Sequence, residues 1–108
     1  MKQFDKSLYY DKLSLEQRLL SNNEEAIAWA YVYVCDDFIS LNQMDSCLVY
    51  LNLAMPLVKR LNNHRLNVQY YNKLAQVSME KKEYRTAITY YEKCVADGII
   101  TNSKFQVL

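Results

Sequence analysis

Glycine and proline are almost missing from this 108-residue chain, which contains one of each, Gly98 and Pro56. Their average usage in proteins is about 7% and about 5%. Tight turns, β-hairpins and flexible linkers depend on these two residues, so a chain with so few of them can form few such features. The scarcity therefore favours helices joined by short polar corners.

An excess of charge of either sign is also lacking. The chain has 13 lysines and arginines against 12 aspartates and glutamates, a net charge of +1, and its basic residues are scattered. Because nucleic acids and anionic membranes are bound by clustered basic residues, we expect neither as a partner. No apolar run approaches the ~18 residues that span a membrane, and the first residues, MKQFD, lack the apolar stretch of a signal peptide. We therefore expect a cytoplasmic protein.

Residues that bind metals are few and scattered. Cys35, Cys47 and Cys94 are odd in number and widely spaced, and His64 is the only histidine. Zinc sites use four ligands, often in closely spaced pairs such as CxxC, and the chain has no such pair. We therefore expect no metal and no cofactor. The three cysteines are predicted to be buried, reduced thiols that pack as small apolar residues.

Two adjacent acidic pairs, Glu24-Glu25 and Asp36-Asp37, are the best candidates for acid–base chemistry. Neighbouring residues in a helix point to different faces, so the two carboxylates of each pair diverge. No histidine and no second acidic pair stands near either of them in the sequence. General acid–base catalysis needs convergent groups, so we expect no catalytic residue and no enzyme.

The sequence resembles itself when it is shifted by 40 residues. Residues of similar size and polarity then fall into the same columns, and small residues recur at fixed places. The clearest columns hold Ser7, Cys47 and Ala87; Leu8, Leu48 and Ile88; Ser14, Ala54 and Cys94; Leu15, Met55 and Val95; Tyr31 and Tyr71; Cys35 and Ala75; and Asn22-Asn23 with Asn62-Asn63. Small side chains allow two helix axes to approach to ~8–10 Å. The repeat therefore predicts pairs of closely packed helices.

Apolar residues recur at intervals of three and four, as in Leu48, Leu51, Met55, Val58 and Leu61, and strand-like alternation is absent. This period is that of an amphipathic α-helix. We predict helices over about residues 4–21, 24–41, 44–61, 65–81 and 84–97, and a sixth that begins near residue 102. Pro56 falls inside the third helix, where a proline removes one backbone donor and is expected to cause a kink.

The predicted helix ends carry recognisable capping residues. The candidates for the starts of the second, third and fourth helices are Asn22 or Asn23, Asn42 or Gln43, and Asn63. Gly98 follows Asp97 at a place where a glycine can end a helix in the left-handed conformation. Thr101 or Asn102 would then start the next helix.

Two stretches of the chain resemble the tetratricopeptide repeat, a helix–turn–helix unit with a fixed order of aromatic, leucine and small residues. One stretch has Tyr71, Leu74, Ala75, Tyr84, Ala87, Ile88, Tyr91 and Cys94; the other has Tyr31, Val34, Cys35, Phe38, Met44, Cys47, Leu51 and Ala54. The resemblance implies an all-α, right-handed superhelix of antiparallel helix pairs. It also implies that Tyr31, Tyr71, Tyr84 and Tyr91 are packed between helices.

The repeats differ from the family in length, because the second helix of the first full unit continues through Pro56 to Leu61. Such elongated repeats resemble those of bacterial regulatory and signalling proteins. In this reading residues 1–108 are one domain: 4–21 are the second helix of a partial repeat, 24–61 and 65–98 are full repeats, and 101–108 start another. The chain is then expected to be a piece of a longer protein.

Repeats of this kind bind other polypeptides along the concave surface formed by the first helix of each unit. The resemblance places the following residues on that surface: Trp29, Val32, Tyr33, Asp36 and Ile39 from one unit, and Gln69, Asn72, Lys73, Gln76 and Met79 from the next. Trp29 and Tyr33 are the expected anchors, since aromatic residues provide large contact areas at small entropic cost. The alternative is that Trp29 only covers the helix over residues 4–21.

We therefore expect a module that binds a protein or peptide within a larger regulatory or signalling protein. The alternative is an intracellular peptide-sensing receptor domain that controls an attached transcriptional-regulator or kinase domain. Self-association through exposed repeat ends is a further expectation, because Phe105, Val107 and Leu108 would form an apolar end.

Overall fold

The computed structural model describes the backbone of residues 3–105 and the side chains of residues 6–98. Over the described backbone the chain forms five α-helices and no strand, which confirms the expected all-α class. The helices are α1 (Gln3–Ser21), α2 (Glu24–Ser40), α3 (Met44–Leu61), α4 (His64–Glu80) and α5 (Tyr84–Phe105). The bounds of the first four helices agree with the sequence prediction to within one residue.

All four corners between helices use the same backbone conformation. The residue two places before the next helix is left-handed in each case, and these residues follow one another at intervals of 20: Asn22 (φ 59°), Asn42 (φ 60°), Asn62 (φ 47°) and Lys82 (φ 63°). Asparagine tolerates this conformation better than other residues with a side chain, apart from aspartate. Corners of two or three residues therefore suffice, and the 40-residue repeat consists of two helices with a corner after each.

The last corner residue caps the start of the next helix. The side chain of Asn23 accepts a hydrogen bond from the backbone nitrogen of Ala26 at 3.1 Å, and Asn63 accepts one from Leu66 at 3.1 Å. Gln43 occupies the same position before α3 without a side-chain bond to the helix. Of the paired candidates in the sequence, the second residue is thus the cap and the first makes the turn.

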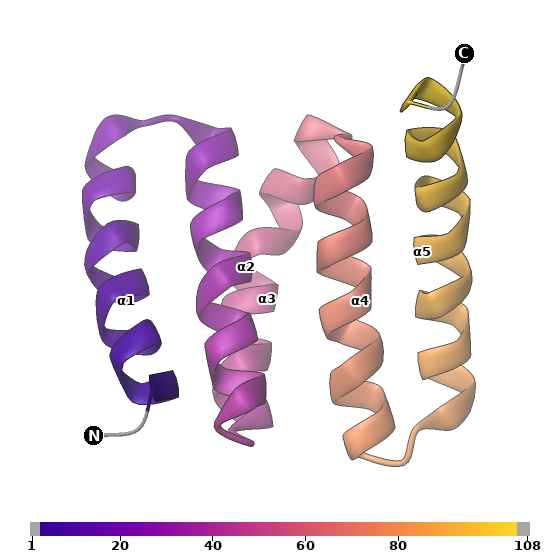
Figure 1. The fold of residues 1–108 in the computed structure, drawn as a ribbon, viewed down its shortest axis with the longest axis horizontal. Coiled ribbons are helices and arrows are strands. Elements are labelled where there is room, and N and C mark those ends of the chain that lie inside the picture. Colours follow the sequence, from indigo (N-terminus) through magenta and orange to yellow (C-terminus); the bar gives the residue numbers. More distant parts are fainter. Residues whose placement is uncertain (1–2, 106–108) are drawn as a thin grey trace.

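Successive helices run antiparallel, and each packs against the next. α2 and α4 also contact each other directly, with α3 lying behind them (Figure 1). α3 is continuous through Pro56, and its second half leans toward α4. That change of direction is the effect expected of a proline inside a helix. The result is a row of helices in which α2 and α4 share one face.

The core follows the columns of the repeat. Cys35 and Ala75 are both fully buried, as are Cys47 and Ala87. The thiol of Cys35 lies 3.5 Å from the carbonyl oxygen of Cys47, a contact between α2 and α3. Cys94 is half-buried, and its thiol reaches the carbonyl oxygen of Val68 at 3.4 Å. All three cysteines are free thiols, as expected, and they pack where two helices approach closely.

The predicted helix end at Gly98 is wrong. α5 continues without interruption from Tyr84 to Phe105, and Gly98 does not adopt a positive φ angle. A sixth helix beginning near residue 102 is therefore not formed. Glycine permits the left-handed conformation but does not require it, and here the helical hydrogen bonds continue through it. Residues 106–108 lie outside the described part of the chain.

Two of the four tyrosines expected between helices are instead exposed. Tyr31 and Tyr71 are half-buried in the core, as predicted. Tyr84 is 53% exposed and Tyr91 is 38% exposed, so the prediction is wrong for these two residues. The reason is that among the described helices α5 contacts only α4, whereas α3 contacts both α2 and α4.

Replacing Gly98 with alanine is expected to stabilise the protein by about 0.5–1 kcal/mol, because glycine is a poor residue inside a helix. A Cβ atom added at Gly98 would meet nothing within 4 Å, so no clash offsets this gain. Thermal unfolding followed by circular dichroism measures it. Ala96→Gly, an exposed change in the same helix, should have the opposite effect. A lower melting temperature for Gly98→Ala would contradict the continuous helix.

Candidate functional site

The face shared by α2 and α4 carries most of the residues predicted to bind a partner. We call it the α2–α4 face and define it by the eight residues Trp29, Val32, Tyr33, Asp36, Gln69, Asn72, Lys73 and Gln76. The two helices contact each other directly, so the two halves of the predicted set are brought together. Ile39 and Met79 follow at the end of the same helices.

One ion pair joins the two halves of the α2–α4 face. The Nζ atom of Lys73 lies 3.5 Å from an Asp36 carboxylate oxygen, and it also donates to the side-chain oxygen of Gln69 at 3.2 Å. The side chain of Lys73 is 6% exposed and that of Asp36 is 62% exposed. The lysine is thus held beneath the surface, where its ion pair is screened less than a surface pair would be. This arrangement fixes Asp36 at the edge of α4.

Side-chain amides form the polar part of the face on α4. Gln76 donates to the side-chain oxygen of Asn72 at 3.3 Å, and Asn72, Gln76 and Gln69 are all half-buried. An amide side chain carries both donors and an acceptor, so each of these residues retains hydrogen-bonding capacity beyond the bond it already makes. A polypeptide backbone needs this mixture of donors and acceptors.

Val32 contributes no accessible surface. It is 2% exposed and belongs to the core between the helices. Val32 and Lys73 therefore lie beneath the α2–α4 face, where they support the exposed residues and offer little surface to a partner. The accessible members of the predicted set are therefore the two aromatic residues, Asp36 and the three amides.

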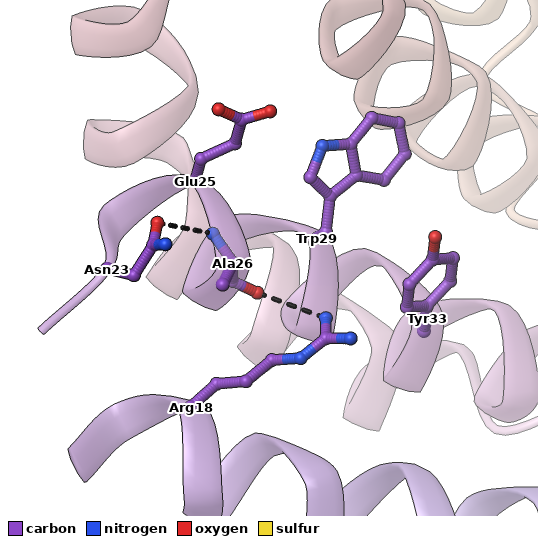
Figure 2. Close-up of a pocket in the computed structure, with 6 residues that line it drawn as sticks. All are labelled: Arg18, Asn23, Glu25, Ala26, Trp29 and Tyr33. Atoms are coloured by element: carbon purple, nitrogen blue, oxygen red, sulfur yellow. Dashed lines mark hydrogen bonds between the residues drawn. The ribbon is translucent and has the colours of Figure 1, made fainter. Parts of the chain in front are cut away.

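Trp29 and Tyr33 form an aromatic pair one turn apart on α2. Their rings stack with centroids 5.9 Å apart and an interplanar angle of 29°. Trp29 is half-buried and Tyr33 is 46% exposed. Figure 2 shows both rings rising from one side of α2, while Arg18 approaches from α1 on the other side. In this view the indole points away from the α1 ribbon.

A hollow of about 380 Å³ lies beside this aromatic pair. Its lining residues come from α1, the first corner and α2: Arg18, Asn23, Glu25, Ala26, Trp29 and Tyr33 (Figure 2). Arg18 donates to the carbonyl oxygen of Ala26 at 3.2 Å, and its guanidinium carbon is 5.9 Å from the centre of the Tyr33 ring. The guanidinium is therefore fixed in the hollow, and the carboxylate of Glu25 provides the opposite charge.

A second hollow, of about 400 Å³, lies at the other end of α2 and α4. Its lining residues are Ile39, Asn42, Met44, Gln76, Met79, Glu80 and Tyr91. Ile39 and Met79 were predicted to extend the binding surface, and here they border the same depression. Since Gln76 also belongs to the α2–α4 face, that face connects an aromatic hollow at one end with a methionine-lined hollow at the other.

Groups suited to catalysis do not converge on this face. The described residues contain no group of three or more histidine, cysteine or acidic side chains that could hold a metal ion. A hydrogen bond with the Cys47 thiol, together with burial, raises the pKa of Cys35, and burial raises that of Cys94. The same hydrogen bond lowers the pKa of Cys47, but the side chain of Cys47 is fully buried and out of reach of a substrate. The accessible groups are aromatic rings, amides and single charges, which suit binding.

A buried carboxyl group next to the site was not predicted from the sequence. Asp37 is 8% exposed, and its Oδ2 atom is buried without a hydrogen-bond partner. Burial raises the pKa of Asp37 to about 8, with further contributions from the hydrogen bond and charge of Asp11 on α1 and from the charge of Asp36. Asp37 is therefore protonated at neutral pH. Its position in the apolar stripe of α2, beside Phe38, was the available signal.

A second missed contact joins α4 to α5. The Nδ1 atom of His64 lies 2.6 Å from a carboxylate oxygen of Asp97, and Asn67 donates to the same oxygen at 3.4 Å. The two partners are 33 residues apart in sequence, so local pattern gives no signal for the pair. The contact fastens the start of α4 to the second half of α5, away from the α2–α4 face.

Comparison with known proteins gives no identity for the chain. No family model, curated protein or solved structure matches it. Among the described residues, no helix combines the length and apolar character needed to cross a membrane. The function is therefore argued from the geometry of the α2–α4 face.

Proposed function

We propose that this chain is a helical-repeat module that binds a peptide segment of another protein along its α2–α4 face. The observation that carries the proposal is the direct contact of α2 with α4, which sets an aromatic pair on one helix beside a row of amides on the other. Neither half alone would offer both an apolar anchor point and backbone-like hydrogen-bonding groups.

The order of the helices supports a tetratricopeptide-like arrangement within this proposal. Residues 24–61 and 64–105 each form a helix pair, with equivalent small residues buried at equivalent positions, and the first helices of the two pairs lie side by side. Stacked helix pairs of this kind produce an extended surface that suits an elongated ligand. Residues 3–21 then supply the second helix of a preceding unit.

The chemistry of the face suggests a peptide of mixed character. An apolar or aromatic side chain would pack against Trp29 and Tyr33 in the first hollow. The amides of Asn72 and Gln76 would pair with the peptide backbone, because they can both donate and accept. Asp36, which is largely exposed at this face, favours a basic residue in the peptide at that point. An extended or helical segment meets these requirements.

Trp29→Ala is expected to weaken peptide binding by more than ~1 kcal/mol, about fivefold or more, because aromatic anchors carry a large share of interface energy. The probe is a peptide selected from a phage-displayed random library on the intact chain, and isothermal titration measures its affinity. Thr89→Ala, an exposed change on α5, is the matched control and should leave the affinity unchanged.

Tyr33→Ala provides an independent variant, because Tyr33 is 46% exposed and its truncation should leave the fold intact. It should weaken the same peptide, with circular dichroism confirming that helical content is retained. Selected peptides whose affinity is unchanged in both variants would contradict the proposed site. Loss of helical content in Trp29→Ala without a binding defect in Tyr33→Ala would make Trp29 a core residue instead.

A further inference from the structure

α5 presents a stripe of large apolar side chains to solvent. Its members are Tyr84, Ile88, Tyr91 and Val95, and their exposures are 53%, 57%, 38% and 60%. The spacing of four, three and four residues keeps them on one line along the helix. The side chains that join α5 to α4, among them Ala87 and Tyr90, lie on a different side, where Tyr90 stacks on Tyr71 with centroids 6.0 Å apart. We call the four exposed residues the α5 stripe.

The internal repeat relates the α5 stripe to residues of α3. Its residues align, 40 positions earlier, with Met44, Leu48, Leu51 and Met55 of α3. There Leu51 is fully buried, Met44 and Leu48 pack against the core, and only Met55 is exposed, at 39%. Three of the four residues of the α5 stripe thus correspond to side chains that are packed in α3, a helix that contacts both α2 and α4. Tyr91 and Val95 border a shallow hollow of about 440 Å³ with Glu92 and Ala96.

Two charges border the α5 stripe along one edge. Arg85 and Glu92 directly follow Tyr84 and Tyr91, so they are seven residues apart and lie on the same side of the helix. Both are exposed, and within the part of the chain that the structure describes no ion pair involves either of them. When two copies of such a helix pack antiparallel, this edge of one helix lies against the same edge of the other, with the residues in opposite order. Arg85 of each copy then lies near Glu92 of the other, offset by two residues or ~3 Å along the helix axis, a separation that these side chains can span.

We propose that the α5 stripe is a self-association surface on which a second copy of this chain docks, with the two α5 helices antiparallel. The arrangement has two-fold symmetry, so each stripe covers the other. Tyr84 lies level with Val95 of the other copy, and Ile88 lies level with Tyr91. The charges at the edge match in this orientation, whereas a parallel pair would bring neither charge opposite its counterpart. The second copy therefore covers positions whose equivalents in α3 are mostly packed.

The size of the surface sets the expected strength. One helix packed on another buries less than the ~1,200 Å² of a standard stable interface. The dimer should consequently be weak and should grow with protein concentration. Val107 and Leu108, which the sequence also suggested for self-association, lie outside the described residues, as does the side chain of Phe105; the proposal does not depend on them.

Sedimentation velocity of the intact chain over a range of concentrations tests the proposal. The unmodified chain should pass from monomer to dimer, and Ile88→Lys should remain monomeric because it places a charge in the middle of the stripe. Thr89→Lys adds the same charge on a side of α5 away from both the stripe and α4, and it should dimerise normally. A chain that stays monomeric at all concentrations, or a dimer that Ile88→Lys leaves intact, would overturn the proposal.

Charge reversal tests the orientation. Arg85→Glu and Glu92→Arg should each dimerise at least several-fold more weakly alone, because like charges then face each other. An equimolar mixture of the two variants should dimerise again, since every pair in the mixed dimer has opposite charges. If neither single change affects dimerisation, or if the mixture does not recover, the antiparallel arrangement is overturned. Circular dichroism verifies that all four variants are folded.

Discussion

Leu51→Ala is expected to lower the free energy of unfolding by about 2–5 kcal/mol, whereas Tyr91→Ala should cost less than about 1 kcal/mol. The two residues occupy the same column of the 40-residue repeat, but Leu51 is fully buried and Tyr91 is 38% exposed. Removing a fully buried leucine loses its apolar burial and leaves a cavity. Truncating an exposed tyrosine leaves no cavity. Urea denaturation followed by circular dichroism measures both changes.

The comparison is made at a protein concentration where the chain is monomeric, so that self-association does not stabilise the Tyr91 side chain. Equal losses for the two substitutions would contradict the finding that α5 lacks a covering helix among the described residues. A small loss for Leu51→Ala would contradict the packing of α3 against its neighbours. The two variants therefore test, in one experiment, whether equivalent positions of the repeat are packed in α3 and exposed in α5.

Asp37→Asn is expected to stabilise the protein by roughly 1–3 kcal/mol at neutral and alkaline pH, because it removes a carboxyl that burial prevents from ionising as readily as it does in the unfolded chain. The ordinary pKa of 3.8 is raised to about 8 in the folded chain. Between these values the folded state holds a proton that the unfolded state has lost. The contribution of Asp37 to stability is thus fully present below pH ~4 and is lost as pH rises through about 8.

The measurement is the free energy of unfolding as a function of pH for the unmodified chain and for Asp37→Asn. The unmodified chain should lose stability as the pH rises across this window, and the variant should lose clearly less. Asp45→Asn is the control, because the side chain of Asp45 is 94% exposed and its ion pair with Lys81 lies at the surface. Parallel pH profiles for the unmodified chain and Asp37→Asn would show that the carboxyl is ionised in the folded state.

The helices and corners were predictable because their signals are local. Apolar residues repeat at the helical period, and an asparagine that tolerates the left-handed conformation makes the turn in three of the four corners. Lys82 makes the turn in the fourth corner without such a signal, at the same 20-residue spacing. At Gly98 a helix end was predicted where the helix continues, since glycine permits a helix end but does not cause one. Local preference alone therefore located the helices but not every end.

The site was predictable only in part, because the exposure of a side chain depends on which other helices pack beside it, and the sequence pattern does not show this. The resemblance to tetratricopeptide repeats placed Trp29, Val32 and Tyr33 on one surface of α2, but it could not show that Val32 lies beneath that surface. Lys73 was expected to be accessible, and its long apolar stem instead allows the side chain to lie buried while Nζ reaches Asp36. Tyr84 and Tyr91 were expected to be covered, and the helix required to cover them is not among those described.

The central claim is that a peptide occupies the α2–α4 face, and chemical-shift mapping tests it most directly. Two-dimensional ¹⁵N–¹H NMR spectra of the labelled chain would be recorded with and without a library-selected peptide, below the concentration at which the chain dimerises. We predict the largest shifts at the Trp29 indole, at the backbone amides of Tyr33 and Asp36, and at the side-chain amides of Asn72 and Gln76. Shifts confined to the α5 stripe or to the outer side of α1, with the α2–α4 face unchanged, would contradict the account.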